Sequence, residues 1–382
     1  MLCRLAVVFL ALFVGSSCYA QSQLQPQQQP QIQSRVPIKA LYIPLADHYA
    51  ALVAYERYRD QMVHADFQIQ QMKNWDLLRA YFQSGGADMA FVMSPLAMDM
   101  YREKPDFRWV GLMHRDGNAL AVNDLIYKRL SLPEKRVERK PTEQVAKVLK
   151  DFHQESGKQT VIGMPHLLST HTVVLYQYLK ENNVQLSLKH STSAAVRAIA
   201  VAPPKAPIFI KGKNNRAQPA AFEQSLPWAD VVETQGFGHV AWYSKDVMPW
   251  PEGHVECIAL AKDSAIESKF KATREVMEFI HKAGADIEKA RRQGGEALEE
   301  IVKIVRKHIP MHNRLAIVAS LNPRLRVINY QNLNIDKPGI KRIMDLAVEG
   351  KILKAPVDID EFADERFGVE IEKNEDVEGV SR

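Results

Sequence analysis

Short apolar runs alternate with amphipathic segments along the first third of the chain, and this alternation constrains the fold more than any other feature. We expect strands at residues 36–43, 67–71, 88–93, 108–113 and 118–122. Segments with helical periodicity lie between them, one opened by Asn74 and the next by Ser94-Pro95. A β-α-β-α-β-α-β order predicts a mostly parallel sheet with right-handed crossovers.

A second unit of this kind lies at Val161–Glu181, whose sequence is VIGMPHLLSTHTVVLYQYLKE. The stretch begins with apolar residues and is interrupted by a glycine and a proline. Ser169 and Thr170 follow as candidate N-caps, and a run with helical apolar periodicity comes after them. This order is typical of a strand, a turn and the first turns of a helix. A helix N-terminus has unpaired N–H groups and a favourable dipole, so the stretch predicts an anion-binding site with His171 beside it.

The remaining elements predict a second α/β lobe. We expect helices at 142–152, 191–200, 219–229, 264–282, 287–308 and 337–349, and strands at 184–188, 207–210, 240–244 and 256–261, with the last two returning to the first lobe. Two lobes joined by two crossings are a common setting for a small ligand. The expected division is 35–122 for the first part of lobe 1, 123–235 for lobe 2, 236–330 for the return to lobe 1 with its helices, 331–367 for a C-terminal helical extension and 368–382 for a disordered acidic tail.

The N-terminus has the pattern of a secretory signal peptide over residues 1–20, with a basic residue, an apolar core and small residues before the cleavage position. A Gln/Pro-rich spacer, 21–34, follows it. We therefore expect a periplasmic protein; a lipoprotein acylated at Cys18 is the weaker alternative, because Gly15 stands where an aliphatic residue is usual. Cleavage after Ala20 leaves Cys257 as the single cysteine, so no intramolecular disulfide can form.

Charge gives little indication of a macromolecular partner. The 382 residues carry a formal net charge of +5, which is too small and too scattered to predict nucleic-acid binding. The basic run Lys128–Lys140 is expected to be a solvated face.

Several sequence blocks carry a family resemblance. They are Ile43–Asp47 (IPLAD), Gly85–Asp88 with Met93–Pro95, Met164–Tyr178, Val201–Pro204 with Ala221-Phe222 and Pro227-Trp228, and Gly350–Asp358 with Glu361-Phe362. In their order and spacing the chain resembles the periplasmic solute-binding proteins of the nitrate/sulfonate/bicarbonate ABC importers, a branch of the type II periplasmic binding fold. The resemblance covers nearly the whole chain after residue 37.

The resemblance implies a monomeric, non-enzymatic protein without a cofactor. Such a protein captures a small molecule, such as nitrate, bicarbonate, a sulfonate, taurine or a pyrimidine, and delivers it to an ABC permease in the inner membrane. A ligand-sensing adaptor for a membrane receptor is an alternative that the sequence leaves open. A thiamine-pyrimidine synthase of the same fold is a further alternative, which three cysteines in total, two of them in the signal peptide, argue against.

Candidate ligand-binding residues come from helix starts, from aromatic positions and from the resemblance. The resemblance assigns His171, with Thr170, to the anion and aligns Lys245 with a ligand-contacting lysine. The residues themselves suggest the rest of the set: Asp47, His48, Met93, Ser94, Ser169, Glu223, Trp228 and Trp242. Two departures from the family pattern, Leu226 for a glutamate and Val92 for a tryptophan, favour a larger or less polar ligand than nitrate or bicarbonate.

The spacing of reactive residues predicts neither a catalytic site nor a metal site. No nucleophile lies near a base in a known motif, and the mature cysteine is isolated. His166 and His171 are five residues apart, not the four that would place both on one helix face, so a metal pair there is a minor alternative. His114 is expected to be structural.

Overall fold

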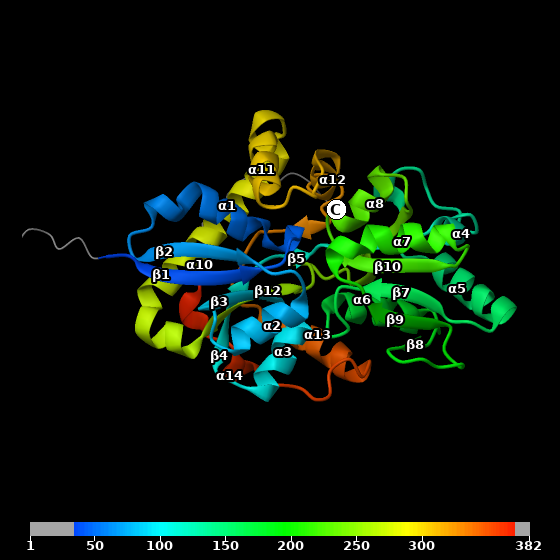
Figure 1. Cartoon of the computed structure of the whole chain (residues 1–382), viewed down its shortest axis with the longest axis horizontal. Helices are drawn as coiled ribbons and strands as arrows, with labels where there is room; N and C mark the ends of the chain where they lie inside the picture. The colour runs from blue at the N-terminus through cyan, green and yellow to red at the C-terminus, as the bar shows by residue number, and fades with distance from the viewer. Residues whose placement is uncertain (1–33, 371–382) are drawn as a thin grey trace, which may run out of the picture. The chain divides into compact units, whose positions relative to one another are not determined.

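The computed structural model describes residues 34–370 (Figure 1). From Arg35 onward these residues belong to one compact unit. The predicted signal peptide, nearly all of the spacer and residues 371–382 of the acidic tail lie outside the described residues. Within the described part, no helix is both long and apolar enough to span a bilayer.

The first of two main sheets has five strands in the order β2-β1-β3-β12-β4. Their bounds are β1 Val36–Tyr42, β2 Ala65–Gln71, β3 Met89–Met93, β4 Phe107–Leu112 and β12 Cys257–Lys262. Strand β1 pairs parallel with β2 and β3, whereas β12 pairs antiparallel with β3 and β4. The expected parallel core is therefore present, with one late strand inserted in the opposite direction.

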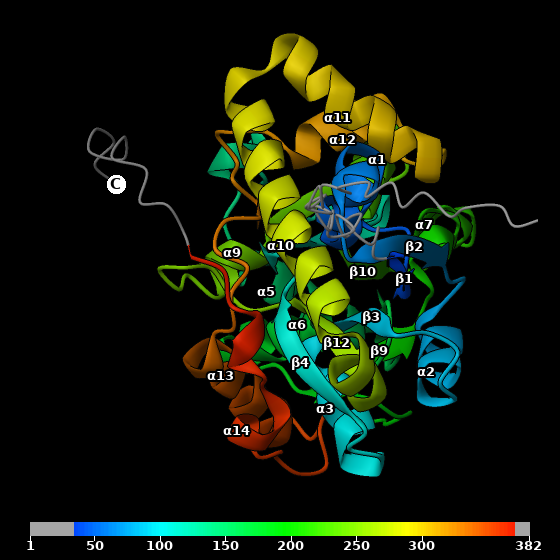
Figure 2. The ribbon, with the colours of Figure 1, turned by 90° about the vertical axis from the view of Figure 1, so that its left-hand side faces the viewer.

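Helices pack on this sheet as the apolar periodicity predicts. They are α1 Tyr49–Tyr58, α2 Trp75–Gln83, α3 Ser94–Glu103 and the long α10 Asp263–Gln293. The side chain of Asn74 accepts a hydrogen bond from Leu77 N and so caps α2, as expected. Figure 2 shows α10 beside the strands; it contacts α1, β1, β2, β4 and β12.

The second main sheet has six strands in the order β11-β6-β10-β7-β9-β8. Their bounds are β6 Asn118–Val122, β7 Thr160–Met164, β8 Leu186–Ser187, β9 Val196–Ala200, β10 Ala220–Ser225 and β11 His239–Tyr243. Strands β7, β8, β9 and β10 pair in parallel, while β6 is antiparallel to both of its neighbours. The accompanying helices are α4 Asp124–Tyr127, α5 Glu143–Ser156, α6 Thr170–Glu181, α7 Ala206–Asn215, α8 Trp228–Thr234 and α9 Ser244–Val247.

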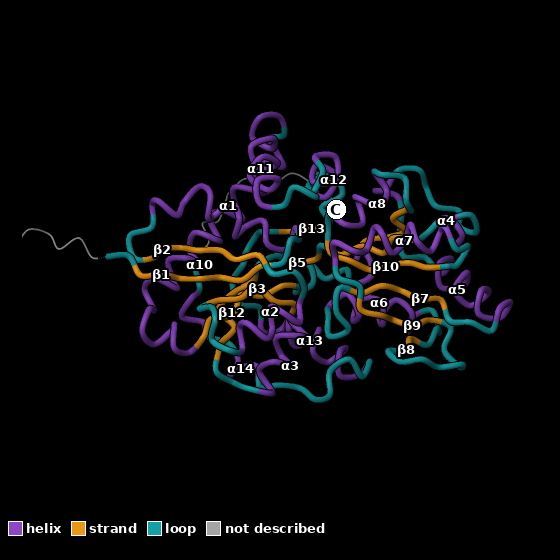
Figure 3. Tube along the Cα trace, in the orientation of Figure 1, coloured by secondary structure: helices purple, strands orange, loops and turns teal. Residues whose placement is uncertain are grey.

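Three predicted elements of the second sheet are wrong in type (Figure 3). The helix expected at 191–200 is replaced over its second half by strand β9, in which buried and half-buried positions alternate over residues 196–199. The strand expected at 207–210 is part of helix α7, which carries Pro207 in its first turn. The helix expected at 219–229 is strand β10 followed by α8. Strand β10 is buried on both faces, so it shows no alternation that could identify it.

Two strands also pair in a sheet other than the expected one. Both β6 and β11 were expected in the first lobe but belong to the six-stranded sheet, because β6 lies between β11 and β10. The division into lobes by residue number stays a prediction. The strand pairing places the crossings between the sheets at 113–117 and 244–256.

The C-terminal helices contact elements of both sheets. They are α11 Gly295–His308, α12 Arg314–Ser320, α13 Lys337–Glu349 and α14 Ile359–Phe362. Strand β13 Ile328–Asn329 lies among them in sequence and pairs with β5 Arg115–Asp116 in a small two-stranded sheet. Helix α13 packs against α3 and α6, and α12 packs against α8. The extension therefore bridges the two sheets.

Candidate functional site: a buried polar cluster between the two sheets

Four segments of the five-stranded sheet meet at one edge. Strands β1, β3 and β4 run in the same direction and end there, leading to Asp47, Ser94 and His114. Strand β12 runs the other way, so its beginning lies at the same edge, where Cys257 pairs with Met93. Glu256, immediately before β12, is therefore placed beside residues that follow the other strands.

The six-stranded sheet presents a matching edge. Strands β7 and β10 are parallel and end there, so β10 supplies Glu223 and Ser225 while β7 leads to helix α6 with His171 in its first turn. The Ser169 side chain accepts a hydrogen bond from Thr172 N and caps α6, as predicted. We use the name intersheet cluster for the buried polar residues at these two edges: Asp47, His114, His171, Glu223, Ser225 and Glu256.

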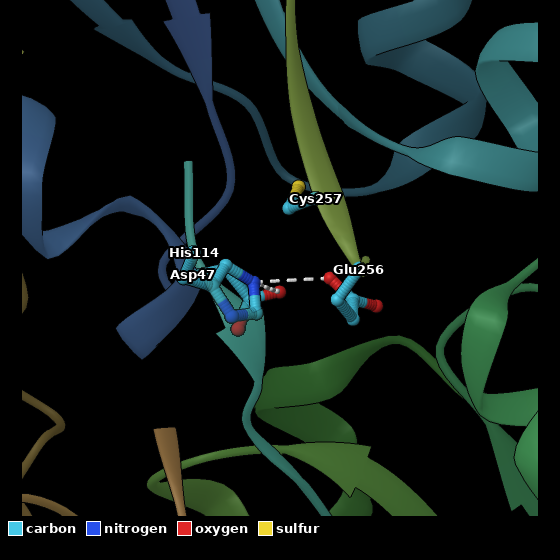
Figure 4. Close-up of side chains that lie close together, drawn as sticks. All are labelled: Asp47, His114, Glu256 and Cys257. Carbon is cyan, nitrogen blue, oxygen red and sulfur yellow. Dashed lines mark hydrogen bonds and ion pairs between the residues drawn. The ribbon is translucent and has the colours of Figure 1, made fainter. Parts of the chain in front are cut away.

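Direct hydrogen bonds join the two halves of the intersheet cluster. The Ser225 hydroxyl donates to Asp47 Oδ2 at 2.9 Å, and His171 Nε2 lies 2.9 Å from the same hydroxyl oxygen. Figure 4 shows His114 between Asp47 and Glu256; its Nε2 is 3.1 Å from Glu256 Oε2 and 3.6 Å from Asp47 Oδ2. All six side chains are fully buried, so the two sheets enclose the cluster completely.

The cluster also contains polar atoms without a partner. Among residues 34–370, Asp47 Oδ1, Glu256 Oε1, His171 Nδ1 and both carboxyl oxygens of Glu223 accept or donate no hydrogen bond. His171 Nδ1 lies 3.3 Å from Glu256 Oε1, but the pair does not meet hydrogen-bond geometry. Each unpaired buried group costs about 1–3 kcal/mol. Such a concentration at one place is typical of a binding site and not of a packed core.

Ionisation at the centre of the cluster is set by burial and by the two carboxylates. Burial favours the neutral imidazole of His114, but Asp47 and Glu256 outweigh it and raise the pKa of His114 to about 10. Burial opposes ionisation of Asp47, yet contact with His114 lowers its pKa below the ordinary value. Burial and the charge of Asp47 raise the pKa of Glu256. Asp47 and His114 thus form an ion pair at neutral pH.

The outer members of the cluster are neutral. Burial lowers the pKa of His171 to about 3, so its imidazole is uncharged at neutral pH. Burial, reinforced by Glu256 and Asp47, raises the pKa of Glu223 well above its ordinary value, so this side chain is a neutral carboxylic acid. A neutral acid both donates and accepts a hydrogen bond. The cluster therefore presents acceptors, one acid proton and no excess positive charge.

The structure brings most of the predicted ligand-binding residues to this place, although their role stays a prediction. Asp47, Glu223 and His171 belong to the cluster itself. The Ser94 and Thr170 hydroxyls lie 3.4 Å apart, so the starts of α3 and α6 face each other. His48 is buried, with Nε2 3.3 Å from Cys257 Sγ.

Other predicted residues lie around the cluster or away from it. The Trp228 indole donates to the carbonyl of Pro44 at 3.1 Å, and Trp242 packs against Tyr178. Met93 is buried at the end of β3. Lys245 is a quarter exposed and pairs with Asp246. Of the minor alternative, a metal pair of His166 with His171, His166 Nε2 lies 3.3 Å from Asp76, whereas His171 Nε2 lies 2.9 Å from the Ser225 hydroxyl.

Sequence reasoning did not find His114, Ser225, Glu256 or Cys257 as site residues. His114 was expected to be structural, and Glu256 was recognised as the start of a strand only. One signal was available: a strand that returns late to a parallel sheet in the opposite direction places its first residue at the edge where the other strands end.

The fold and the enclosed cluster define an α/β protein of the type II periplasmic binding class. The nitrate-binding protein NrtA of Synechocystis superposes with a TM-score of 0.70 at 15% identity, covering 87% of each chain. The ligand-binding component of an ABC-type import system of Staphylococcus aureus, solved with zinc bound, gives a TM-score of 0.67 at 19% identity over 87% of this chain and 98% of that one. The alkanesulfonate-binding SsuA of Xanthomonas axonopodis pv. citri, bound to MOPS, gives 0.62 at 11% identity over 86% and 99%.

The sequence itself identifies the family. Residues 34–304 match the model of the NMT1-like family, and the chain belongs to that family. A search of curated protein sequences finds no match. The predicted type II periplasmic binding fold and the predicted family resemblance are confirmed.

Proposed function

We propose that the chain is the solute-binding component of an ABC importer and that the intersheet cluster holds the solute. The observation that carries the proposal is the set of unpartnered polar atoms between the sheets, among them Asp47 Oδ1 and Glu256 Oε1 within the described residues. Membership of the NMT1-like family supports it, as does the likeness in fold to ligand-binding components of import systems.

Closure of two lobes on a solute accounts for the burial of the cluster. A fully enclosed site can exchange its ligand only when the two sheets separate. In the closed arrangement the sheets meet through Ser225 and Asp47, and through the backbone, where Ala46 N donates to the Leu226 carbonyl at 2.8 Å. A solute that contributes hydrogen bonds to both edges stabilises the closed form over the open one.

The charges of the cluster indicate the chemistry of the solute. Asp47, Glu223 and Glu256 supply carboxyl oxygens, and within residues 34–370 neither Asp47 nor Glu256 pairs with a lysine or arginine. A bare anion would therefore meet acceptors instead of donors. We propose a small polar solute that carries N–H or O–H donors, such as an amine or an aminopyrimidine, in place of free nitrate.

Export and delivery complete the proposal. The predicted signal peptide at 1–20 would place the protein in the periplasm, where its partner is an ABC permease in the inner membrane. In this proposal the protein acts as a monomer that binds and releases its solute without a catalytic step.

A thermal-shift screen tests the proposal. The purified chain is heated with nitrate, bicarbonate, sulfonates, taurine, amines and pyrimidines. A cognate solute at a hundred times its Kd stabilises the folded state by about 2.7 kcal/mol and raises Tm by several degrees. Amines or pyrimidines should raise Tm more than nitrate does. No shift with any compound would contradict solute capture, and a shift with nitrate alone would contradict the proposed chemistry.

Substitution of His171 tests the position of the site. His171→Ala removes a buried imidazole that hydrogen-bonds Ser225, and we expect solute affinity to fall by about tenfold or more, as for a buried hydrogen bond. The matched control is His190→Ala, which removes an exposed histidine of the same chain. Equal affinities for the two variants, measured by calorimetry, would remove His171 from the site.

A further inference from the structure

Four buried side chains at one edge of the five-stranded sheet each offer one metal-ligating atom within a small volume. They are Asp47, His114, Glu256 and Cys257, and their ligand atoms all lie within 4.8 Å of one another (Figure 4). We propose that these four residues bind a divalent transition-metal ion of the zinc type. The proposal rests on the same intersheet position as the proposed function and adds a cation to it.

The distances are close to those of a tetrahedral site. Bonds of about 2.0–2.1 Å from a zinc ion to nitrogen and oxygen place neighbouring ligand atoms about 3.3 Å apart. His114 Nε2 is 3.1 Å from Glu256 Oε2 and 3.6 Å from Asp47 Oδ2. These two separations lie on either side of the tetrahedral value, and all four ligand atoms lie within 4.8 Å of one another. The Cys257 sulfur adds a fourth ligand with a longer bond, about 2.3 Å.

An independent observation points to a ligand at this place. Asp47 Oδ1 and Glu256 Oε1 are buried and make no hydrogen bond within the described part of the chain. Two adjacent carboxylates carry two negative charges, and among residues 34–370 their charged partner is the His114 imidazolium alone, with no lysine or arginine paired to either, so a second positive charge is lacking. A divalent cation supplies that charge. It also satisfies the free oxygens when each carboxylate binds the ion through both of its oxygens instead of one.

Neighbouring groups hold the four ligands in place. Ser225 donates to Asp47 Oδ2 at 2.9 Å, and His48 Nε2 is 3.3 Å from the sulfur of Cys257. His114 Nδ1 is 3.4 Å from the Arg115 carbonyl, on the side of the ring opposite Nε2. Metal-binding histidines and carboxylates usually have outer partners of this kind, which fix their orientation.

The ligand set selects the metal. Two carboxylates, one imidazole and one thiol combine hard oxygen donors with nitrogen and soft sulfur donors, a mixture that suits zinc and neighbouring first-row ions. Magnesium and calcium take oxygen ligands and do not use the sulfur.

Metal binding is measured first without any solute. The purified chain is stripped with a chelator and titrated with zinc by calorimetry, and with cobalt(II) by absorption spectroscopy. We expect one ion per chain and a thiolate-to-cobalt charge-transfer band from Cys257. The absence of stoichiometric binding of either ion would overturn the proposal.

Variants test the four ligands. His114→Gln and Glu256→Gln should each weaken zinc binding by about 100-fold, and Cys257→Ser should abolish the charge-transfer band. The matched control is Glu56→Gln, which removes a carboxylate that also pairs with a histidine, His308, at 2.7 Å. The control should bind zinc as the parent does. Unchanged zinc affinity in His114→Gln, or a band that survives Cys257→Ser, would overturn the assignment. Circular dichroism confirms that each variant is folded.

The thermal-shift screen, repeated on metal-free and zinc-loaded protein, separates this inference from the proposed function. A solute shift without any zinc binding would overturn the metal site alone. If zinc binds at the four ligands but no solute changes Tm in either form, the metal site is supported and solute capture is contradicted. A solute shift that requires zinc supports both.

Discussion

Two buried charged clusters in this chain differ in how fully their polar atoms are paired. The first is the intersheet cluster. The second, which we name the arginine cluster, consists of Arg136, Arg139, Asp230 and Glu233. Both join segments far apart in the sequence, and both contain carboxylates that are largely or completely buried.

Each carboxyl oxygen of the arginine cluster has a donor. Asp230 accepts from Arg136 through one oxygen and from Ser320 through the other at 2.7 Å. Glu233 accepts from Arg136 at 2.9 Å and from Arg139 at 2.8 Å. The basic run that supplies these arginines was expected to be solvated; that expectation is wrong for Arg139, which is 6% exposed.

The difference separates a structural role from the binding role that we propose for the intersheet cluster. A closed set of charge-assisted hydrogen bonds has no capacity left for a ligand and holds the fold together. The intersheet cluster keeps Glu223 and one oxygen each of Asp47 and Glu256 without a partner among residues 34–370. Such unpaired groups lower the free energy of unfolding in the absence of ligand. Proteins often have lower stability at functional sites for this reason.

The largest expected effect is in the arginine cluster. Glu233→Ala leaves Arg139 and part of Arg136 buried without their carboxylate, so we expect the free energy of unfolding to fall by about 3–5 kcal/mol. Urea denaturation of parent and variant measures the loss. A loss below 1 kcal/mol would mean that the paired cluster is not structural, and the comparison would fail.

The opposite sign is expected in the intersheet cluster. Glu223→Met replaces a buried acid, whose two oxygens are unpaired in the described structure, by an apolar side chain of similar volume. We expect the free energy of unfolding to rise by about 1–2 kcal/mol and solute binding to be lost. The same urea assay, combined with the solute thermal shift, checks both. A destabilised variant would show that Glu223 has a packing role that its contacts do not reveal.

A smaller effect follows from a single buried histidine outside both clusters. Burial lowers the pKa of His312 to about 3, against about 6.5 in the unfolded chain. The unfolded chain therefore takes up the proton first, and stability from this group is present above pH 6.5 and lost as pH falls. Between pH 7.5 and 5.5 the loss is about 1.4 kcal/mol.

His312→Gln tests this pH dependence. Glutamine does not titrate, so the variant should lose about 1.4 kcal/mol less stability than the parent over the same pH interval. Denaturation curves at both pH values give the comparison. If parent and variant lose stability equally, the imidazole of His312 is not held neutral in the fold.

The smallest effect is expected at Lys245. Its side chain is a quarter exposed and pairs with Asp246, so Lys245→Ala should change stability by less than about 0.5 kcal/mol. It should also reduce solute affinity less than His171→Ala does. Calorimetric titration compares the solute affinities of the two variants. A larger loss of affinity in Lys245→Ala would indicate that the solute binds nearer to β11.

The sequence predicted the fold better than the site for a physical reason. The first four strands and the N-terminus of α6 carry local signals, such as the Asn74 and Ser169 caps. Strand β10 does not, because it places Glu223 and Ser225 where a buried strand would usually have apolar residues. The polar residues that form the candidate site therefore also interrupt the apolar pattern by which strand β10 could have been recognised.

The site also depends on contacts that no local pattern encodes. Ser225 and Asp47 are separated by 178 residues, and His48 and Cys257 by 209. Helix starts could be found from N-caps, which gave Asp47, Ser94 and His171. Strand direction decides the rest: only the antiparallel insertion of β12 brings Glu256 and Cys257 to that edge.

The bridging position of α13 bears on how fast a captured molecule can leave. Helix α13 packs against α3 beside one sheet and α6 beside the other, and Lys180 of α6 pairs with Glu349 at its end. A rotation that separates the sheets must detach α13 from one of these helices. In the proposed cycle of opening and closure, that detachment would add to the activation barrier for opening, and α13 would contribute to the lifetime of the closed complex.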